Sequence, residues 1–217
     1  MHDASDSVTR ANTALLVIDM QNDYCHPAGG LAAAGVLPYR TSMIEAMAPV
    51  LMRTIEAARQ LDMRLIWIRT EYGDSTTSRN WLHRGAGQPL HICCPGTWGT
   101  EWYLVAPRAD EIVITKHRYS PFVNTPLETV LRAQSISTLV ITGTSTNVCV
   151  ESTARDAFMR DYHVVVLADC TASYDRNVHE ASLLNVSRHF GTVMESAEMF
   201  RLIGAEQPKA ATRTELG

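Results

Sequence analysis

The sequence lacks any apolar run approaching the roughly 20 residues that a helix needs to cross a membrane, so it does not suggest a membrane partner. The first segment, MHDASDSVTRAN, does not have the charged-then-apolar order of a secretory signal, and we predict that residues 1–12 form a flexible leader. No cluster of lysine and arginine is present either. Together with a net charge of −4, this argues against a nucleic-acid partner.

A disulfide framework is also missing, because the cysteines are few and irregularly spaced. They are Cys25, Cys93, Cys94, Cys149 and Cys170, an odd number in no spacing typical of a scaffold. Such a set fits reduced thiols in a reducing compartment. The sequence therefore predicts a cytoplasmic protein.

Internal repeats and low-complexity segments are absent too, which leaves an ordinary globular chain. Of its 217 residues, 46% are hydrophobic and 19% are charged. That length suits one domain with a substantial core. We expect this domain to cover residues 13–204, followed by a polar tail over residues 205–217.

Short, continuous apolar runs recur along the chain with helical patterns between them. Continuous runs are typical of strands buried on both faces, and their alternation with helices predicts an α/β fold with a mostly parallel sheet. The expected strands are 14–18, 65–68, 112–114, 139–141 and 164–167, and the expected helices are 41–60, 125–134, 148–160 and 177–189.

One long segment, residues 71–107, interrupts this alternation. It is rich in glycine and proline and contains the aromatic residues Trp81, Trp98, Trp102 and Tyr103. Long excursions inside a domain are usually functional or disordered, and the aromatic content argues against disorder. We therefore predict a lid or pocket wall.

Three ionisable residues come at the carboxyl ends of predicted strands, where ligands of such sheets bind. Asp19 ends the first run, Lys116 ends the third, and Cys149 follows the fourth through a turn. Each alone has a plain structural interpretation, as a turn carboxylate, a solvated lysine or a small buried thiol. If their strands are neighbours, the three groups meet as base, cation and nucleophile, which is what nucleophilic catalysis requires.

Cys149 also stands at the start of a helical pattern. Free backbone N–H groups and the positive end of the peptide dipoles both favour a thiolate there. We therefore expect the pKa of Cys149 to be lowered. The same N–H groups are suited to holding an oxyanion.

The segments around these three residues resemble the signature segments of the isochorismatase-like cysteine hydrolases. They read IDMQNDYCHPAGGL, ITKHRYSPFVNTPLETVL and VITGTSTNVCVESTARDAF, and the resemblance covers nearly the whole chain. It implies a three-layer, Rossmann-like, doubly wound sheet of six parallel strands and a catalytic triad of Asp19, Lys116 and Cys149. It also implies a cis peptide bond between Thr144 and Ser145, with the N–H groups of Ser145 and Cys149 as the oxyanion hole.

Within this superfamily the catalytic cysteine points to amide chemistry, because isochorismatase itself lacks it. Nicotinamidases bind a metal through an Asp-x-His pair after the second strand, and the corresponding stretch here, WIRTEYGD, has no such pair. His83, His91 and His117 have no metal-ligand spacing. We interpret them as surface or pocket-lining residues and expect no catalytic metal and no cofactor.

The segments KHRYSPFVNTPLETVLR and NVCVESTARDAF resemble the ureidoacrylate amidohydrolases, and RNWLHRGAG and PGTWGTE resemble biuret and triuret hydrolases as well. Biuret hydrolase differs in having glutamine where His189 aligns. We predict a cysteine-dependent amidohydrolase that cleaves a C–N bond of a small ureidoacrylate-, triuret- or biuret-like compound through a thioester and releases ammonia or an amine. The alternatives are an amidase for N-carbamoyl amino acids or other small amides, and a redox or scaffold protein.

Five further residues are candidates for substrate contact: Asn22, Cys25, Trp81, Tyr119 and His189. The amide of Asn22 is equally suited to shaping the loop of Asp19, and Trp81 is as readily a packing residue. The resemblance also implies a homodimer or homotetramer that acts on a small molecule.

Overall fold

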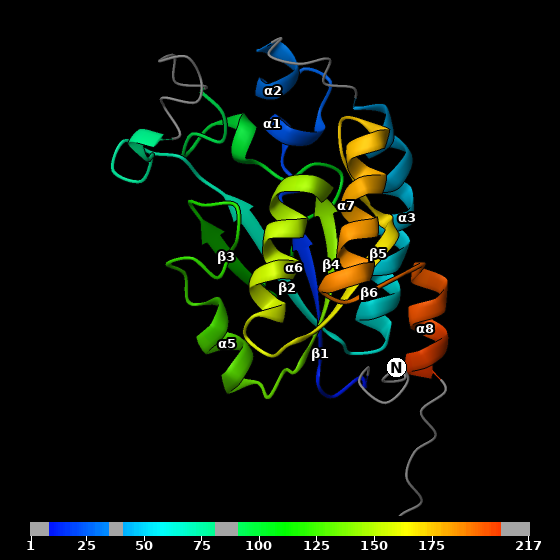
Figure 1. Ribbon diagram of the computed structural model, residues 1–217. Coiled ribbons are helices and arrows are strands. Elements are labelled where there is room, and N and C mark those ends of the chain that lie inside the picture. Colours follow the sequence, from blue (N-terminus) through cyan, green and yellow to red (C-terminus); the bar gives the residue numbers. More distant parts are fainter. Residues whose placement is uncertain (1–8, 35–40, 81–90, 205–217) are drawn as a thin grey trace, which may run out of the picture.

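The structure, a computed structural model, describes residues 9–34, 41–80 and 91–204 of the chain. Six parallel strands form one sheet in the order β3-β2-β1-β4-β5-β6, with helices on both of its faces (Figure 1). This is the three-layer, doubly wound α/β sheet that the sequence predicts.

The five predicted strands and four predicted helices are present in the predicted order, with ends that differ by a few residues, and β6, α1, α2 and α8 are additional elements. The strands are β1 (Thr13–Ile18), β2 (Arg64–Thr70), β3 (Ile112–Lys116), β4 (Thr138–Thr144), β5 (His163–Ala172) and β6 (Thr192–Met194). The helices are α1 (Asn22–Cys25), α2 (Gly30–Ala33), α3 (Ser42–Gln60), α5 (Leu127–Ala133), α6 (Glu151–Phe158), α7 (Arg176–His189) and α8 (Ser196–Gly204), with the short turns η2 (Trp98–Thr100) and η3 (Thr146–Val150). Within the described ranges, none of the helices has the length and apolar character that crossing a bilayer requires.

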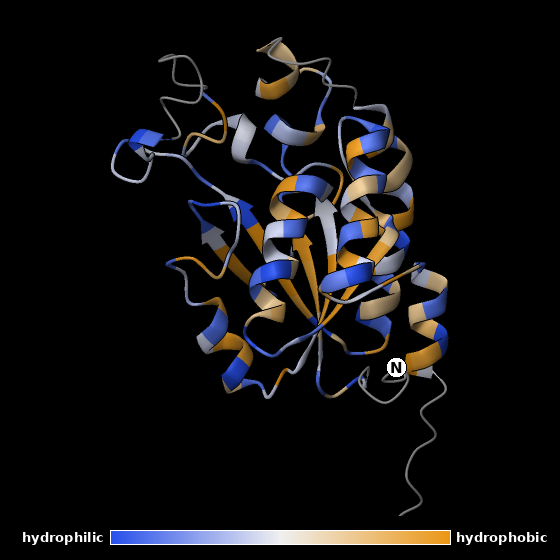
Figure 2. Cartoon of the chain, in the orientation of Figure 1, coloured by the Kyte–Doolittle hydropathy of each residue, from blue (hydrophilic) through white to orange (hydrophobic). Residues whose placement is uncertain are grey.

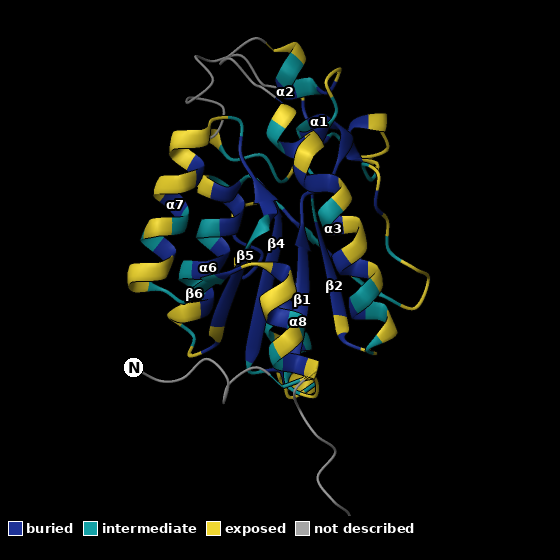
Figure 3. Cartoon of the chain, turned by 90° about the vertical axis from the view of Figure 1, so that its right-hand side faces the viewer, coloured by how far each residue is buried: buried dark blue, intermediate teal, exposed yellow. Residues whose placement is uncertain are grey.

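The alternation of side chains along each strand divides the core into two layers. Leu15 and Val17 of β1 lie in the layer that contains α3 and α8, whereas Leu16 and Ile18 lie in the layer that contains α5, α6 and α7. Because both faces are covered, the central strands β1 and β4 are buried along their whole length and the sheet interior is largely apolar, as Figures 2 and 3 show. This double burial explains why the strands appear in the sequence as continuous apolar runs.

The carboxyl edge of the sheet is covered by α1, α2 and the described part of the 71–107 segment (Figure 1). Gln21, just before α1, forms an antiparallel bridge with Trp102. The N–H of Tyr103 donates to the carbonyl oxygen of Met20 at 2.8 Å. The segment is thus anchored directly on the loop that follows β1.

The predicted flexible leader extends too far along the chain. The carbonyl oxygen of Asn12 accepts hydrogen bonds from the N–H groups of Ser137 and Thr138, and its side chain accepts from Thr9. Residues 9–12 therefore belong to the folded domain, because the contact with the β4 side continues ahead of β1. Residues 1–8 and 205–217 lie outside the described residues.

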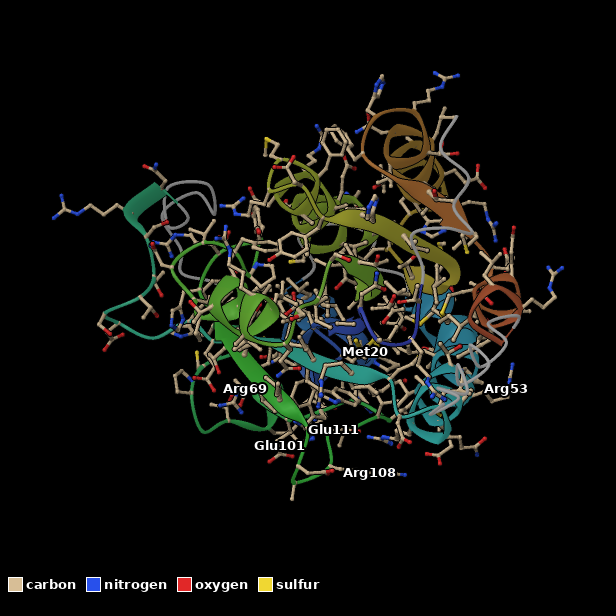
Figure 4. The ribbon with its side chains drawn as sticks, turned by 90° about the horizontal axis from the view of Figure 1, so that it is seen from below. Met20, Arg53, Arg69, Glu101, Arg108 and Glu111 are labelled. Carbon is tan, nitrogen blue, oxygen red and sulfur yellow. The ribbon has the colours of Figure 1, made fainter. Side chains whose placement is uncertain are left out.

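A polar network closes the opposite, amino edge of the sheet. The carboxylate of Glu111 accepts two hydrogen bonds from Arg59, at 2.7 and 2.9 Å, one from the indole of Trp67 and one from the backbone N–H of Arg108, both at 2.8 Å. Burial works to raise the pKa of Glu111, but these contacts outweigh it and the pKa is lowered. Figure 4 shows Glu111 and Arg108 close together on the underside of the molecule. The network ties α3 to β2 and β3.

Gly143 lets β4 run close beside the end of β1. It pairs with Ile18, has a φ of +102°, and a Cβ atom at this position would lie 2.0 Å from the carbonyl oxygen of Ile18. Both the backbone conformation and the close contact require glycine. The turn that follows β4 is thereby held beside the residue that follows β1.

We expect Gly143→Ala to lower the free energy of unfolding by about 2–4 kcal/mol, because the new Cβ must push β1 away and a positive φ disfavours alanine. Gly73→Ala is the matched control, since a Cβ there meets nothing closer than 3.6 Å. Urea denaturation of the two variants measures the difference. Equal midpoints would show that the close approach does not constrain the fold.

Candidate functional site

Asp19, Lys116 and Cys149 meet at the carboxyl edge of the sheet. The Nζ atom of Lys116 lies 2.7 Å from Oδ2 of Asp19 and 3.4 Å from Sγ of Cys149. The three residues are 1%, 0% and 6% exposed, respectively. A carboxylate, an ammonium and a thiol therefore share one enclosed point, and the predicted meeting of the three side chains is present.

The strands that carry these residues are not all neighbours, because β2 lies between β1 and β3. Lys116 pairs in register with Thr70, the last residue of β2. Two strand spacings amount to about 10 Å. Only a long side chain at the end of β3 bridges that distance, and the ammonium of Lys116 passes over Thr70 on its way to Asp19.

Asp19 adopts a backbone conformation that is rare for residues other than glycine. Its φ is 52°, in the left-handed region that aspartate tolerates better than most residues. Its N–H donates to the carbonyl oxygen of Ile68 in β2 at 2.9 Å, and Sγ of Cys25 lies 3.6 Å from its carbonyl oxygen. The chain therefore turns sharply at Asp19 while its backbone stays bonded on both sides.

Cys149 follows a turn that contains a cis peptide bond between Thr144 and Ser145, as the family resemblance implies. The next residues form η3, a π-helical turn in which the N–H of Val150 donates to the carbonyl oxygen of Ser145 at 3.2 Å. The turn continues directly into α6. Cys149 thus lies within this π-helical turn, two residues before α6 begins, rather than at the first residue of the helix.

Helix α7 supports this turn through side-chain hydrogen bonds. Oγ1 of Thr146 lies 2.8 Å from Nδ1 of His179. Oγ of Ser182 donates to Oε2 of Glu151 at 2.6 Å and lies 3.1 Å from the carbonyl oxygen of Thr146. Burial lowers the pKa of His179, which favours its neutral form. The turn η3, which carries Cys149, is therefore held to α7 by side-chain contacts.

The charges of the cluster differ from the prediction. Burial raises the pKa of the Cys149 thiol to about 12; the ammonium of Lys116 lowers this pKa, but the carboxylate of Asp19 raises it further. Burial also works to lower the pKa of Lys116, yet Asp19 and Cys149 raise it above its ordinary value. The expected lowered pKa of Cys149 is therefore wrong, because the positive charge of Lys116 is already matched by Asp19. The free protein holds a thiol beside an ion pair.

The described candidates for substrate contact divide between the loop of Asp19 and the loop after β3. Asn22 is buried, and its amide donates to the carbonyl oxygen of Trp98 at 3.0 Å, which favours the loop-shaping interpretation. Cys25 is fully buried against the loop of Asp19, and burial raises the pKa of its thiol. Tyr119 is partly exposed, three residues after Lys116. Trp81 lies outside the described residues.

His189 does not join the site, and the prediction that it contacts the substrate is wrong for this chain. It is the last residue of α7, is exposed, and has its ring 5.9 Å from the ring of Phe190. Helix α7 begins at the carboxyl edge of the sheet and runs for 14 residues toward the opposite edge (Figure 1). That length is about 21 Å, which separates His189 from the triad.

A small apolar cluster joins α2 to the 71–107 segment. It consists of Leu31, Tyr72, Ile92 and Cys93, with Tyr24 packed against it. Burial raises the pKa of both tyrosines, and the charges of the triad contribute to the shift. The two phenols are therefore close enough to the triad to sense its charges, and they are neutral.

Three residues that the sequence analysis did not single out hold the site together. Thr70 contacts both Lys116 and Asp19. Gln21 bonds to the backbone of Thr70 from the loop of Asp19. Asp23 accepts hydrogen bonds from the N–H groups of Gly30 and Cys93, at 2.8 and 2.6 Å, and so joins α2 to the 71–107 segment.

A sequence signal for these residues exists. Gln21 and Asp23 stand with Asp19 in the single motif IDMQND, and polar residues at such density directly after a buried strand indicate a structured loop. Thr70 ends the apolar run LIWIRT, as Asp19 and Lys116 end theirs. Thr70 would therefore be a candidate if hydroxyl side chains at strand ends were considered together with ionisable ones.

Among the residues that the structure describes, no group of three or more His, Cys, Asp or Glu side chains is arranged to hold a metal ion. Nδ1 of His117 lies 2.7 Å from the carbonyl oxygen of Glu71, and His91 is exposed. His83 falls outside the described ranges.

Comparisons with known proteins agree with this architecture. A family model described as the isochorismatase domain matches residues 13–198. The chain is 35% identical over 212 residues to a protein named ureidoacrylate amidohydrolase RutB from Methylobacterium radiotolerans, a match that covers 89% of this chain and 80% of that protein.

Two solved structures extend the comparison. A cysteine hydrolase from Pseudomonas syringae pv. phaseolicola 1448A has a TM-score of 0.78 and 32% identity, covering 91% of this chain and 94% of that chain. An N-carbamoylsarcosine amidase from Thermoplasma acidophilum has a TM-score of 0.68 and 28% identity, covering 85% of this chain and 96% of that chain.

Because the thiol of Cys149 is protonated at neutral pH, its alkylation by iodoacetamide is expected to accelerate by roughly tenfold per pH unit between pH 7 and pH 10, in proportion to the thiolate fraction. Peptide mapping assigns the label to Cys149, and Cys149→Ala gives the background. A rate that levels off below pH 8 would show instead that Lys116 maintains a thiolate in the free protein.

Proposed function

The chain belongs to the isochorismatase family and is a hydrolase of carbon–nitrogen bonds other than peptide bonds, and from this premise we propose that it cleaves a small ureido or carbamoyl compound through a thioester on Cys149. The observation that carries the proposal is the buried contact of an ammonium with both a carboxylate and a thiol. Such a set supplies a nucleophile, a base and a fixed positive charge in one enclosed space.

The first step is a proton transfer coupled to attack. Since the free thiol is protonated, Asp19 takes the proton from Cys149 as the sulfur bonds to the substrate carbonyl carbon. Lys116 remains charged throughout and stabilises the negative charge that moves between the carboxylate and the substrate. The carboxylate that acts as the base is held by the ammonium of Lys116 at 2.7 Å.

The carbonyl oxygen becomes an oxyanion in the same step. We assign its stabilisation to the backbone N–H groups of Ser145 and Cys149, which stand at the two ends of the turn after β4. Removal of one such donor typically lowers turnover by about 10²- to 10³-fold. The support that α7 gives to Thr146 keeps this turn in place.

Collapse of the oxyanion breaks the C–N bond, and Asp19 returns its proton to the nitrogen, which leaves as ammonia or an amine. The carbonyl carbon remains on the sulfur as a thioester. Water then attacks this carbon, Asp19 accepts the proton from the water, and the sulfur leaves and is protonated again. Both halves of the reaction use one base and one oxyanion site.

The substrate class follows from the relatives. The relative from Methylobacterium radiotolerans is named for ureidoacrylate, and we propose a ureidoacrylate-like compound as substrate, with biuret and triuret as further members of the same class. The second candidate is an N-carbamoyl amino acid, which the similarity to the N-carbamoylsarcosine amidase supports. A homodimer or homotetramer in the cytoplasm, as predicted from the sequence, completes the proposal.

Cys149→Ala is expected to lower the release of ammonia from the best substrate to the uncatalysed rate, because the variant has no nucleophile. The test measures ammonia release from ureidoacrylate, biuret, triuret and N-carbamoyl amino acids. Cys170→Ala is the matched control, since Cys170 is also buried but its Sγ lies 3.2 Å from Oγ1 of Thr54, outside the site.

The intact protein, quenched in acid during turnover, is expected to carry the mass of the acyl or carbamoyl group on Cys149. Ammonia release by Cys149→Ala at the wild-type rate would overturn the assignment of the nucleophile. Preference for N-carbamoyl amino acids over every ureido compound would favour the second candidate.

A further inference from the structure

Thr70 touches both charged members of the triad with a single hydroxyl group. It is the last residue of β2, is fully buried, and pairs in register with Lys116 on one side. On the other side, β2 pairs with β1, which ends just before Asp19. Its hydroxyl therefore lies between the two charges.

The direction of each hydrogen bond at Thr70 is fixed by chemistry. Nζ of Lys116 lies 2.6 Å from Oγ1 of Thr70, and an ammonium can only donate, so Oγ1 accepts this bond. The hydroxyl has a single hydrogen, and it is directed to Oδ1 of Asp19 at 2.9 Å. Each carboxylate oxygen of Asp19 then has one donor, Thr70 on Oδ1 and Lys116 on Oδ2.

The same hydroxyl completes the surroundings of the ammonium. Lys116 has three N–H bonds, and its three partners within hydrogen-bonding distance are Oδ2 of Asp19, Oγ1 of Thr70 and Sγ of Cys149. With two of the bonds fixed by oxygen atoms, the third is directed at the sulfur. A buried ammonium that loses one partner turns or moves to find another.

The backbone of Thr70 is held as firmly as its side chain. The amide of Gln21 donates to the carbonyl oxygen of Thr70 at 2.9 Å, and its Oε1 accepts the N–H of Thr70 at 2.7 Å. Gln21 lies two residues after Asp19. The loop that carries the Asp19 carboxylate is therefore hydrogen-bonded to the backbone of Thr70, whose hydroxyl donates to that carboxylate. These two hydrogen bonds between the Gln21 side chain and the Thr70 backbone fix the relative position of the two residues.

We propose that Thr70 is a positioning residue of the reaction: its hydroxyl holds the carboxylate of Asp19 and the ammonium of Lys116 in the arrangement that accepts the Cys149 proton. The role rests on the proposed function, because it needs Asp19 as the base. It adds a fourth residue to the triad, one that contacts no substrate.

Thr70→Val keeps the shape of the side chain and removes its hydroxyl. We expect kcat to fall by about 10- to 100-fold, the range seen when a partner that orients an active-site group is removed. The acid limb of the pH profile of kcat/KM should move to higher pH, because a carboxylate that has lost a donor is protonated more easily. Thr70→Ser should restore both the rate and the profile.

Thr142→Val is the matched control. Thr142 is also a fully buried threonine near the end of a central strand, but its hydroxyl donates to the carbonyl oxygen of Leu16 at 2.8 Å, away from the charges. It should keep the wild-type pH profile. Wild-type kinetics in Thr70→Val, a Thr70→Ser variant as impaired as Thr70→Val, or the same shift in Thr142→Val would overturn the proposal. Thr70→Ala replaces Thr70→Val if the latter does not fold.

Alkylation of Cys149 gives a second readout that needs no substrate. Iodoacetamide should react several-fold more slowly with Thr70→Val at neutral pH than with the wild type, because the base and the cation are no longer held against the sulfur. Unchanged alkylation would contradict the role of Thr70. If the wild type releases no ammonia from any compound tested but its alkylation still depends on Thr70, the proposed substrate class fails, whereas the placement of Asp19 and Lys116 by Thr70 against the sulfur is supported.

Discussion

The buried ion pair between Lys116 and Asp19 is the interaction on which the rest of the site depends. An ammonium removed completely from water is strongly disfavoured unless charge and hydrogen bonds replace the lost hydration. Here the carboxylate, the hydroxyl of Thr70 and the sulfur of Cys149 replace it. Each partner comes from a different strand end, so the pair requires β1, β2, β3 and β4 to be in register at once. Gly143, which allows β4 to approach β1, and the two hydrogen bonds from Gln21 to Thr70 help to keep these strands in register.

The same ion pair determines how the thiol reacts. A free cation beside a cysteine would favour a thiolate, but the charge of Lys116 is already balanced. A thiolate in this dry space would add an unmatched negative charge, and the thiol therefore keeps its proton. In the mechanism that we propose, the negative charge forms only when Asp19 takes that proton, at the moment when the backbone N–H groups of the turn meet the substrate oxygen. That mechanism couples ionisation of the sulfur to its attack on the substrate.

Much of the fold is visible in the sequence because its determinants are local. The central strands are buried on both faces and so form continuous apolar runs. β6 has only three residues, Thr192–Met194, at the edge of the sheet, and no run marks it. Strand order depends on packing between distant elements, which explains why the position of β2 between the two charged residues was not foreseen.

Within the site, the sequence indicates the reactive groups but not their state or their support. Asp19, Lys116 and Cys149 stand at strand ends and carry recognisable motifs. The pKa of Cys149 depends on burial and on a charge balance that spans four strands, which no local pattern encodes. Thr70 is a neutral residue, and its role is recognised only from its hydrogen bonds to Asp19 and Lys116 in the structure. The prediction for His189 is wrong because α7 begins near the site and its last residue, His189, lies toward the amino edge of the sheet.

The contacts that build the site join residues far apart along the chain: Lys116 and Asp19 are separated by 97 positions, Asp19 and Thr70 by 51, and Lys116 and Cys149 by 33. Closing loops of that length costs chain entropy before any contact compensates for it. A partly folded chain that contains only some of these strands lacks the partners of Lys116 and cannot bury its ammonium away from water. The arrangement of the three reactive groups is therefore a property of the complete sheet and not of any part of it.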